Sequence, residues 1–133
     1  MDLIKRKGEK VGLVKDVCHK FKYSFQGIAH CFTHETSFIY ESLAIIAAVV
    51  FGILFHIRFE EWALSLVTLF LIMEVEFLNT GIEAVVDMVT EEYHPLAKIA
   101  KDCGSAATCV ATFVALAVNL FVFIPYIINF FSK

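Results

Sequence analysis

Residues 62–89 read WALSLVTLFLIMEVEFLNTGIEAVVDMV, and this stretch decides the fold. Its first part is apolar from Trp62 to Met73, which is typical of a helix that crosses a lipid bilayer. Its second part carries four acidic residues and one asparagine, an unusual polar load for such a helix. We therefore expect a membrane-spanning helix over residues 62–89 whose second half serves a purpose beyond anchoring.

The composition of the whole chain agrees with an integral membrane protein. Its 133 residues are 59% hydrophobic and 19% charged, against roughly 45–50% and about 25% in average soluble domains. Three crossings of about 20 residues each leave too little chain for a separate soluble catalytic domain. The composition excludes a disordered chain, a nucleic-acid-binding tail and a soluble multidomain enzyme, and no nucleic-acid partner is expected.

Two further stretches have the length and hydropathy of membrane spans, namely residues 38–57 and residues 105–131. The loop before the last span covers residues 90–102 and contains Pro95, which suits the first turn of a new helix. The predicted fold class is therefore all-α integral membrane, with three transmembrane helices.

The N-terminal part predicts a fourth helix of a different kind. Residues 11–34 alternate apolar and cationic positions at helical spacing, as in an amphipathic helix lying in the membrane interface. Packing against the other helices is the alternative. We expect residues 1–133 to form a single domain without a cleavable signal peptide, and its four cysteines to be reduced and packed.

Basic residues predict the orientation of these spans. Seven of the eleven lysines and arginines lie in the first 22 residues, and Lys98 and Lys101 lie in or near the second loop. The opposite side has only Arg58 and Lys133. The positive-inside rule then predicts a multi-pass protein of the cell membrane with a cytoplasmic N-terminus and an outside C-terminus.

Four polar residues of the second span share one face of the helix. At about 100° per residue, Glu76, Asn79, Glu83 and Asp87 fall within an arc of about 80°, whereas Glu74 lies on the opposite side. A carboxylate in hydrocarbon costs about 3 kcal/mol or more. Such a face is therefore either a structural seam between helices or a functional site.

Depth divides this polar face. About 20 residues after Trp62, the inner membrane boundary lies near Gly81. Glu83 is then at the cytoplasmic border, and Glu76 is about 10 Å deeper, too far away to share one metal ion. Glu83 suits a hydrated cation and a soluble anionic substrate, whereas Glu76 suits the hydroxyl group of a lipid.

Residues beyond the border add to this picture. Lys101 supplies a cation for phosphate, and Glu83 with Glu35 has the oxygen ligands to hold Mg²⁺. Carboxylate, metal and lysine together are the apparatus of phosphoryl transfer. The chain has neither a Walker P-loop nor a kinase glycine-rich loop. From the residues alone, an ion or proton pathway and a purely structural membrane subunit remain open.

Three motifs strongly resemble the prokaryotic diacylglycerol kinase family, which includes the undecaprenol kinases. They are EFLNTGIEAVVD at residues 76–87, Tyr93-His94, and AKDCGSAA at residues 100–107. The run FKYSFQGI at residues 21–28 also looks like the N-terminal segment of the family. The resemblance covers roughly residues 20–125.

The resemblance implies a homotrimer that transfers the γ-phosphate of ATP to a lipid hydroxyl with Mg²⁺. It implies that Glu76 is the general base and contacts the lipid substrate together with Ser105, that Glu35 and Glu83 carry the metal, and that Asn79 and Asp87 form a supporting network. The implied ATP-binding residues are Tyr23, Glu35, Glu83, Glu92, Tyr93, His94, Lys101 and Asp102.

The chain departs from the family pattern at three positions. Gly81 stands where alanine is common, Glu74 where an apolar residue is usual, and Asp16 where the diacylglycerol-type enzymes tend to be basic. The run at residues 104–107 resembles diacylglycerol-type enzymes, whereas the N-terminal run and the C-terminal tail resemble polyprenol-type enzymes. We expect undecaprenol as the substrate, with diacylglycerol as the alternative.

Overall fold

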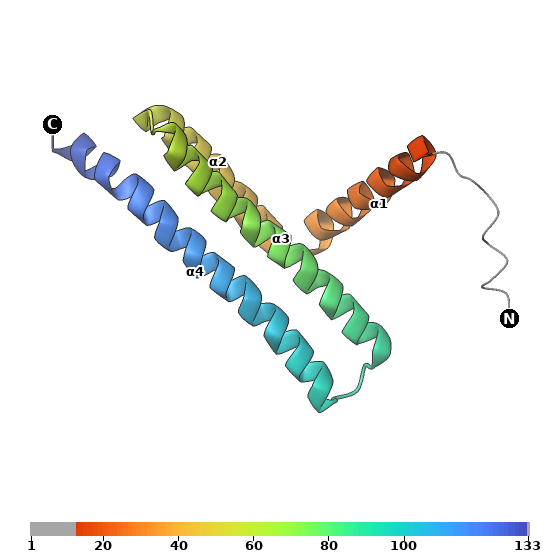
Figure 1. Cartoon of the computed structure of the whole chain (residues 1–133). Coiled ribbons are helices and arrows are strands. Elements are labelled where there is room, and N and C mark those ends of the chain that lie inside the picture. The colour runs from red at the N-terminus through yellow and green to blue at the C-terminus, as the bar shows by residue number, and fades with distance from the viewer. Residues whose placement is uncertain (1–12, 133) are drawn as a thin grey trace, which may run out of the picture. The chain divides into compact units, whose positions relative to one another are not determined.

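The computed structural model describes the backbone of residues 13–132 and the side chains of residues 17–132, and in this part the regular secondary structure is all helical (Figure 1). The four helices are α1 (Leu13–His34), α2 (Ser37–Phe55), α3 (Phe59–Val89) and α4 (Pro95–Phe131). Helix α1 belongs to one compact unit, and α2, α3 and α4 form a second. Each unit is described by itself.

Helices α2, α3 and α4 are each long and apolar enough to cross a membrane, which confirms the prediction of three candidate spans. Helix α3 begins at Phe59, slightly before the predicted span, and α2 ends at Phe55. Helix α4 begins at Pro95 and so contains the predicted span together with the segment before it. The interfacial position of α1 stays a prediction.

Helix α3 lies in the middle of the second unit, with α4 antiparallel beside it along most of its length (Figure 1). The buried core joins all three helices through Ala48 of α2, Leu69 and Ile72 of α3, and Ala111 and Ala115 of α4. Alanine at the α4 positions lets the helix backbones approach closely, as small residues do in membrane bundles.

A polar cluster lies within this apolar packing. The Ser65 hydroxyl, on a side chain that is almost fully buried, donates to Asn119 Oδ1 at 2.6 Å. The Asn119 amide nitrogen donates in turn to the Ala115 carbonyl at 2.8 Å. Since a spanning helix has no water to satisfy such groups, the hydrogen bond between Ser65 and Asn119 helps to hold α3 and α4 in register.

The turn between α2 and α3 is also tied to α4. His56 takes a left-handed conformation, with φ 53°, that ends α2. The Arg58 backbone N–H donates to Glu61 Oε2 at 2.8 Å, which caps α3. The same carboxylate oxygen accepts the Tyr126 hydroxyl of α4 at 2.6 Å. This end of the bundle is therefore closed by a shared carboxylate.

Cys18, Cys103 and Cys109 are free thiols. Only Cys31 is buried, whereas Cys18, Cys103 and Cys109 are exposed. The prediction of packed positions is therefore wrong for three of them within a single chain, because cysteine content alone does not reveal which face of a helix a thiol occupies.

Candidate active site

A cavity of about 490 Å³ opens beside Glu76, between α2, α3 and α4. Two carboxyl groups line it, Glu76 from α3 and Glu41 from α2. The rest of the wall is apolar or carries hydroxyl and thiol groups, and consists of Ser37, Tyr40, Ala44, Leu69, Ile72, Thr108, Cys109, Thr112 and Phe113. The cavity therefore suits a ligand that has a polar group for the two carboxyl groups and is otherwise hydrocarbon.

Glu41 is the residue that the sequence analysis missed. Its Oε2 atom is buried and has no hydrogen-bond partner in the described part of the chain. A buried acceptor left without a donor costs about 1–3 kcal/mol, so this oxygen favours a ligand that brings a hydroxyl proton. The signal was present in the sequence, because Glu41 is an acid inside the predicted span 38–57.

Packing of α2 on α3 fixes the depth of Glu41. Phe38, one turn earlier in α2, is fully buried, and its ring lies 4.5 Å from that of Phe77 between centroids. At 3.6 residues per turn, Glu41 then lies on nearly the same side of α2 as Phe38 and faces the same cavity as Glu76.

Asn79 lies one turn beyond Glu76 and is buried where α3 meets α4 at Gly104. Its side-chain nitrogen donates to Glu83 Oε1 at 3.0 Å, which orients that carboxylate. Its Oδ1 lies so close to Gly104 that no Cβ atom could be accommodated there. Glycine at position 104 is therefore what admits the Asn79 amide between the two helices.

Charged residues gather toward the end of the bundle that holds the α3–α4 loop. Lys101 Nζ lies 2.6 Å from Asp87 Oδ1, so an expected nucleotide contact and an expected network residue form an ion pair between α4 and α3. Lys98 and Asp102 form a second ion pair on the exposed face of α4. The described structure thus gives both Lys101 and Asp102 a partner of opposite charge.

The remaining expected ATP-binding residues of this end lie in or next to the loop. Glu92, Tyr93 and His94 are all exposed. The Nδ1 atom of His94 accepts the backbone N–H of Leu96 at 3.3 Å and so caps α4. Ser105, the expected lipid contact, is exposed on α4 and is not among the residues that line the Glu76 cavity.

The two expected metal ligands are both half-buried. Glu35 precedes α2, and Glu83 accepts the Asn79 amide at its Oε1 atom. No cluster of three acidic, histidine or cysteine side chains able to hold a metal occurs among the described residues. Tyr23 is exposed in α1, within the other unit.

The carboxyl groups of Glu35 and Glu83 meet one requirement of a magnesium site. Mg²⁺ is usually held by one or two carboxylates together with water and substrate phosphates, rather than by a complete protein cage. An oriented carboxylate at the polar end of α3 meets that requirement, and the nucleotide would have to supply the other ligands.

Comparison with known proteins places this arrangement in a family. The family profile described as "Prokaryotic diacylglycerol kinase" matches residues 22–123. The "Undecaprenol kinase" of Bacillus subtilis is 32% identical over 105 residues, which cover 79% of this chain and 85% of that protein. The "Diacylglycerol kinase" of Escherichia coli is 39% identical over 94 residues, which cover 71% and 77%.

A third relative, the "Diacylglycerol kinase" of a Synechocystis species, is 33% identical over 110 residues, which cover 82% of this chain and 63% of that longer protein. The matched region contains every expected site residue described above, from Tyr23 to Ser105. The chain therefore belongs to the prokaryotic diacylglycerol kinase family, whose named members are lipid kinases.

Proposed function

We propose that this protein transfers the γ-phosphate of ATP to the hydroxyl group of a membrane lipid, most suitably undecaprenol, at the cytoplasmic border of the cell membrane. The observation that carries the proposal is the cavity in which Glu76 and Glu41 face a largely apolar wall. A lipid alcohol fits this cavity, because it combines a hydroxyl group that can donate a proton with a long hydrocarbon chain.

Glu76 acts as the general base in this proposal. Its carboxylate takes the proton of the lipid hydroxyl while the lipid oxygen forms a bond to the γ-phosphorus and the bond to the β-phosphate oxygen breaks, which releases ADP. As the lipid binds, its hydroxyl group donates to Glu41 Oε2, which has no donor within the described chain, and then turns to Glu76 for the transfer of its proton. The apolar wall excludes water, so that phosphate is not lost to hydrolysis.

The polar end of the bundle handles the nucleotide. Lys101 faces the phosphates with its position set by Asp87, at 2.6 Å. Glu83, oriented by Asn79, holds Mg²⁺ together with Glu35, and the ion neutralises phosphate charge when it is bound. Glu92, Tyr93, His94, Asp102 and Tyr23 complete the proposed nucleotide contacts, and Ser105 the lipid contacts.

We favour undecaprenol as the substrate because of the Bacillus relative and because the N-terminal and C-terminal segments resemble those of polyprenol-type enzymes. Diacylglycerol is the alternative, supported by the Escherichia coli relative and the run at residues 104–107. We further propose a homotrimer, and the orientation that places the α3–α4 loop in the cytoplasm. The excess of basic residues in the N-terminal segment and near this loop supports that orientation.

The test is label transfer from γ-labelled ATP to undecaprenol or to diacylglycerol in mixed micelles with Mg²⁺. Glu76→Gln should abolish turnover while ATP binding persists, whereas Glu83→Gln should weaken both because a metal ligand is lost. Glu74→Gln is the matched control, since it makes the same change on the opposite side of α3 and should leave turnover within about twofold.

Two results would overturn this assignment. Full turnover by the Glu76→Gln variant would remove Glu76 from its role as the base. Label transfer to neither lipid by the unmodified protein, combined with nucleotide-independent ion flux through reconstituted vesicles, would favour a pathway for ions or protons instead.

A further inference from the structure

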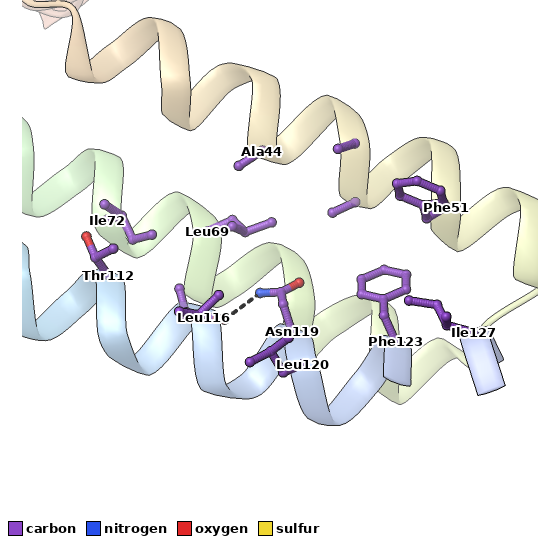
Figure 2. Close-up of a pocket in the computed structure, with 13 residues that line it drawn as sticks. Ala44, Phe51, Leu69, Ile72, Thr112, Leu116, Asn119, Leu120, Phe123 and Ile127 are labelled. Carbon is purple, nitrogen blue, oxygen red and sulfur yellow. Dashed lines mark hydrogen bonds between the residues drawn. The ribbon is translucent and has the colours of Figure 1, made fainter. Parts of the chain in front are cut away.

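A second cavity, of about 390 Å³, continues along the bundle from the cavity beside Glu76 (Figure 2). The two share four lining residues, Ala44 of α2, Leu69 and Ile72 of α3, and Thr112 of α4. They therefore form one groove, which has α3 as its floor and α2 and α4 as its sides. One end of this groove holds the two carboxyl groups, and the other lies between Phe51 and Phe123.

The second part of the groove presents hydrocarbon to a ligand. One lining residue, Asn119, has an amide side chain, but both polar atoms of this amide already form hydrogen bonds within the protein. Its Oδ1 accepts from Ser65 at 2.6 Å and its nitrogen donates to the Ala115 carbonyl at 2.8 Å, the bond dashed in Figure 2. The hydroxyl group of Thr112, the other polar lining residue, donates to the Thr108 carbonyl at 2.9 Å, and no charged side chain lines this part.

The groove is longer than one leaflet of the membrane. From Thr108 to Ile127 on α4 it extends about 28 Å at 1.5 Å per residue. Half of the hydrocarbon core of a bilayer is about 15 Å thick. A chain that starts with its hydroxyl at Glu76 can therefore follow the groove beyond the bilayer midplane.

We propose that this groove holds the hydrocarbon chain of the lipid substrate and selects for a single chain longer than one leaflet, which is the chemistry of a polyisoprenoid alcohol. This inference rests on the proposed lipid kinase function and adds a chain-length selectivity to it. The occupant follows from continuity, since the groove opens directly into the cavity that binds the reacting hydroxyl. Acyl chains of ordinary lipids would fill only the half nearest Glu76.

Ala47 is the residue at which to block the far half. It lines the second cavity but not the first. Leu69 of α3 lines the same cavity, and its position before Gly81 in the helix places it about 18 Å inside the membrane boundary, beyond the midplane. Ala47→Phe should fill the groove there, while the cavity at Glu76 stays open.

The experiment compares kcat/KM for undecaprenol with kcat/KM for geraniol, a two-unit isoprenoid alcohol short enough to end within the first cavity. The ratio of the two values should fall roughly tenfold in the Ala47→Phe variant, the size expected when a pocket loses room for part of a chain. Ala117→Phe is the matched control, because Ala117 is exposed on α4 at a similar depth and lines neither part of the groove.

The possible outcomes separate the two proposals. If the unmodified protein phosphorylates neither these alcohols nor diacylglycerol, the proposed function fails and the groove inference fails with it. If it phosphorylates diacylglycerol alone, the lipid kinase function stands and the groove inference fails. If it phosphorylates both and Ala47→Phe lowers both equally, the function stands and the groove does not hold the chain, as when a helix of a second copy fills it. Should Ala47→Phe not fold, Leu120→Trp narrows the same part of the groove from α4 and must shift the same ratio.

Discussion

Replacing Gly104 by alanine should damage both the stability of the bundle and its activity, although it adds only one methyl group. A Cβ atom at this position would overlap Asn79 Oδ1 and lie 3.3 Å from Asn79 Cγ. Because the same amide donates to Glu83, a shift of the amide away from the new methyl group should disturb that hydrogen bond. The methyl group therefore forces apart the contact that orients the proposed metal ligand.

The expected loss of stability can be bounded. Inserting a methyl group into a filled contact costs about 1–3 kcal/mol. Alanine offsets about 0.5–1 kcal/mol of this, because glycine weakens the interior of a helix. The net loss in the free energy of unfolding is on the order of 1 kcal/mol. A weakened hydrogen bond to a charged group, worth about 1.5–3 kcal/mol, should lower kcat/KM at least about tenfold.

Gly81 offers a matched control in the same bundle. A Cβ atom at Gly81 would meet nothing within 4 Å. Gly81→Ala should therefore raise the free energy of unfolding by about 0.5–1 kcal/mol and leave activity within about twofold. Unfolding of both variants can be followed in mixed micelles by titration with SDS, using the fluorescence of Trp62, the single tryptophan of the chain.

A double variant tests the cause. Asn79→Ala removes the atoms that the new methyl group would strike, so adding it to Gly104→Ala should restore part of the lost stability without restoring activity. The reasoning is refuted if Gly104→Ala unfolds like the unmodified protein and keeps its kcat/KM. It is also refuted if the two substitutions simply add their costs.

Two further predictions concern the ends of the bundle. Lys101→Met should raise the KM for ATP roughly tenfold, the equivalent of one charge-assisted hydrogen bond, and an unchanged ATP saturation curve would remove Lys101 from the nucleotide site. Tyr126→Phe removes the hydroxyl that donates to Glu61 Oε2 at 2.6 Å, which should lower the free energy of unfolding by about 1.5–3 kcal/mol with activity within about twofold. The same SDS titration measures this loss, and unchanged unfolding would show that the hydrogen bond adds nothing to stability.

Much of the fold could be predicted from hydropathy and helical spacing. Long apolar runs gave three candidate spans, because an apolar helix of about 20 residues is what a bilayer accepts. The polar face of α3 was also predictable in part. Asn79 and Glu83 are four residues apart, so a helix places them in contact, and the structure joins them by a hydrogen bond of 3.0 Å.

What the sequence could not supply is the register between helices. The pairs Asn79 with Gly104, Asp87 with Lys101 and Ser65 with Asn119 each join α3 to α4, and no local pattern fixes which residues face one another. Periodicity identifies the face of a helix but not the partner that covers it. For the same reason the groove between α2 and α4 was not foreseen, since its walls come from three separate segments.

The arrangement along α3 suggests how such a small chain can perform chemistry on two very different substrates. Glu76 lines the largely apolar groove, while Asp87, about three turns further along the same helix, is exposed and paired with Lys101. One rigid helix therefore fixes the distance between a site for a greasy alcohol and a site for a charged nucleotide. Asn79 and Glu83 occupy the interval between them, so a disturbance at Gly104 should impair the use of both substrates, whereas a block at Ala47 should impair only one. This difference follows from the levels of α3 against which Gly104 and Ala47 lie, and the two sets of variants measure it directly.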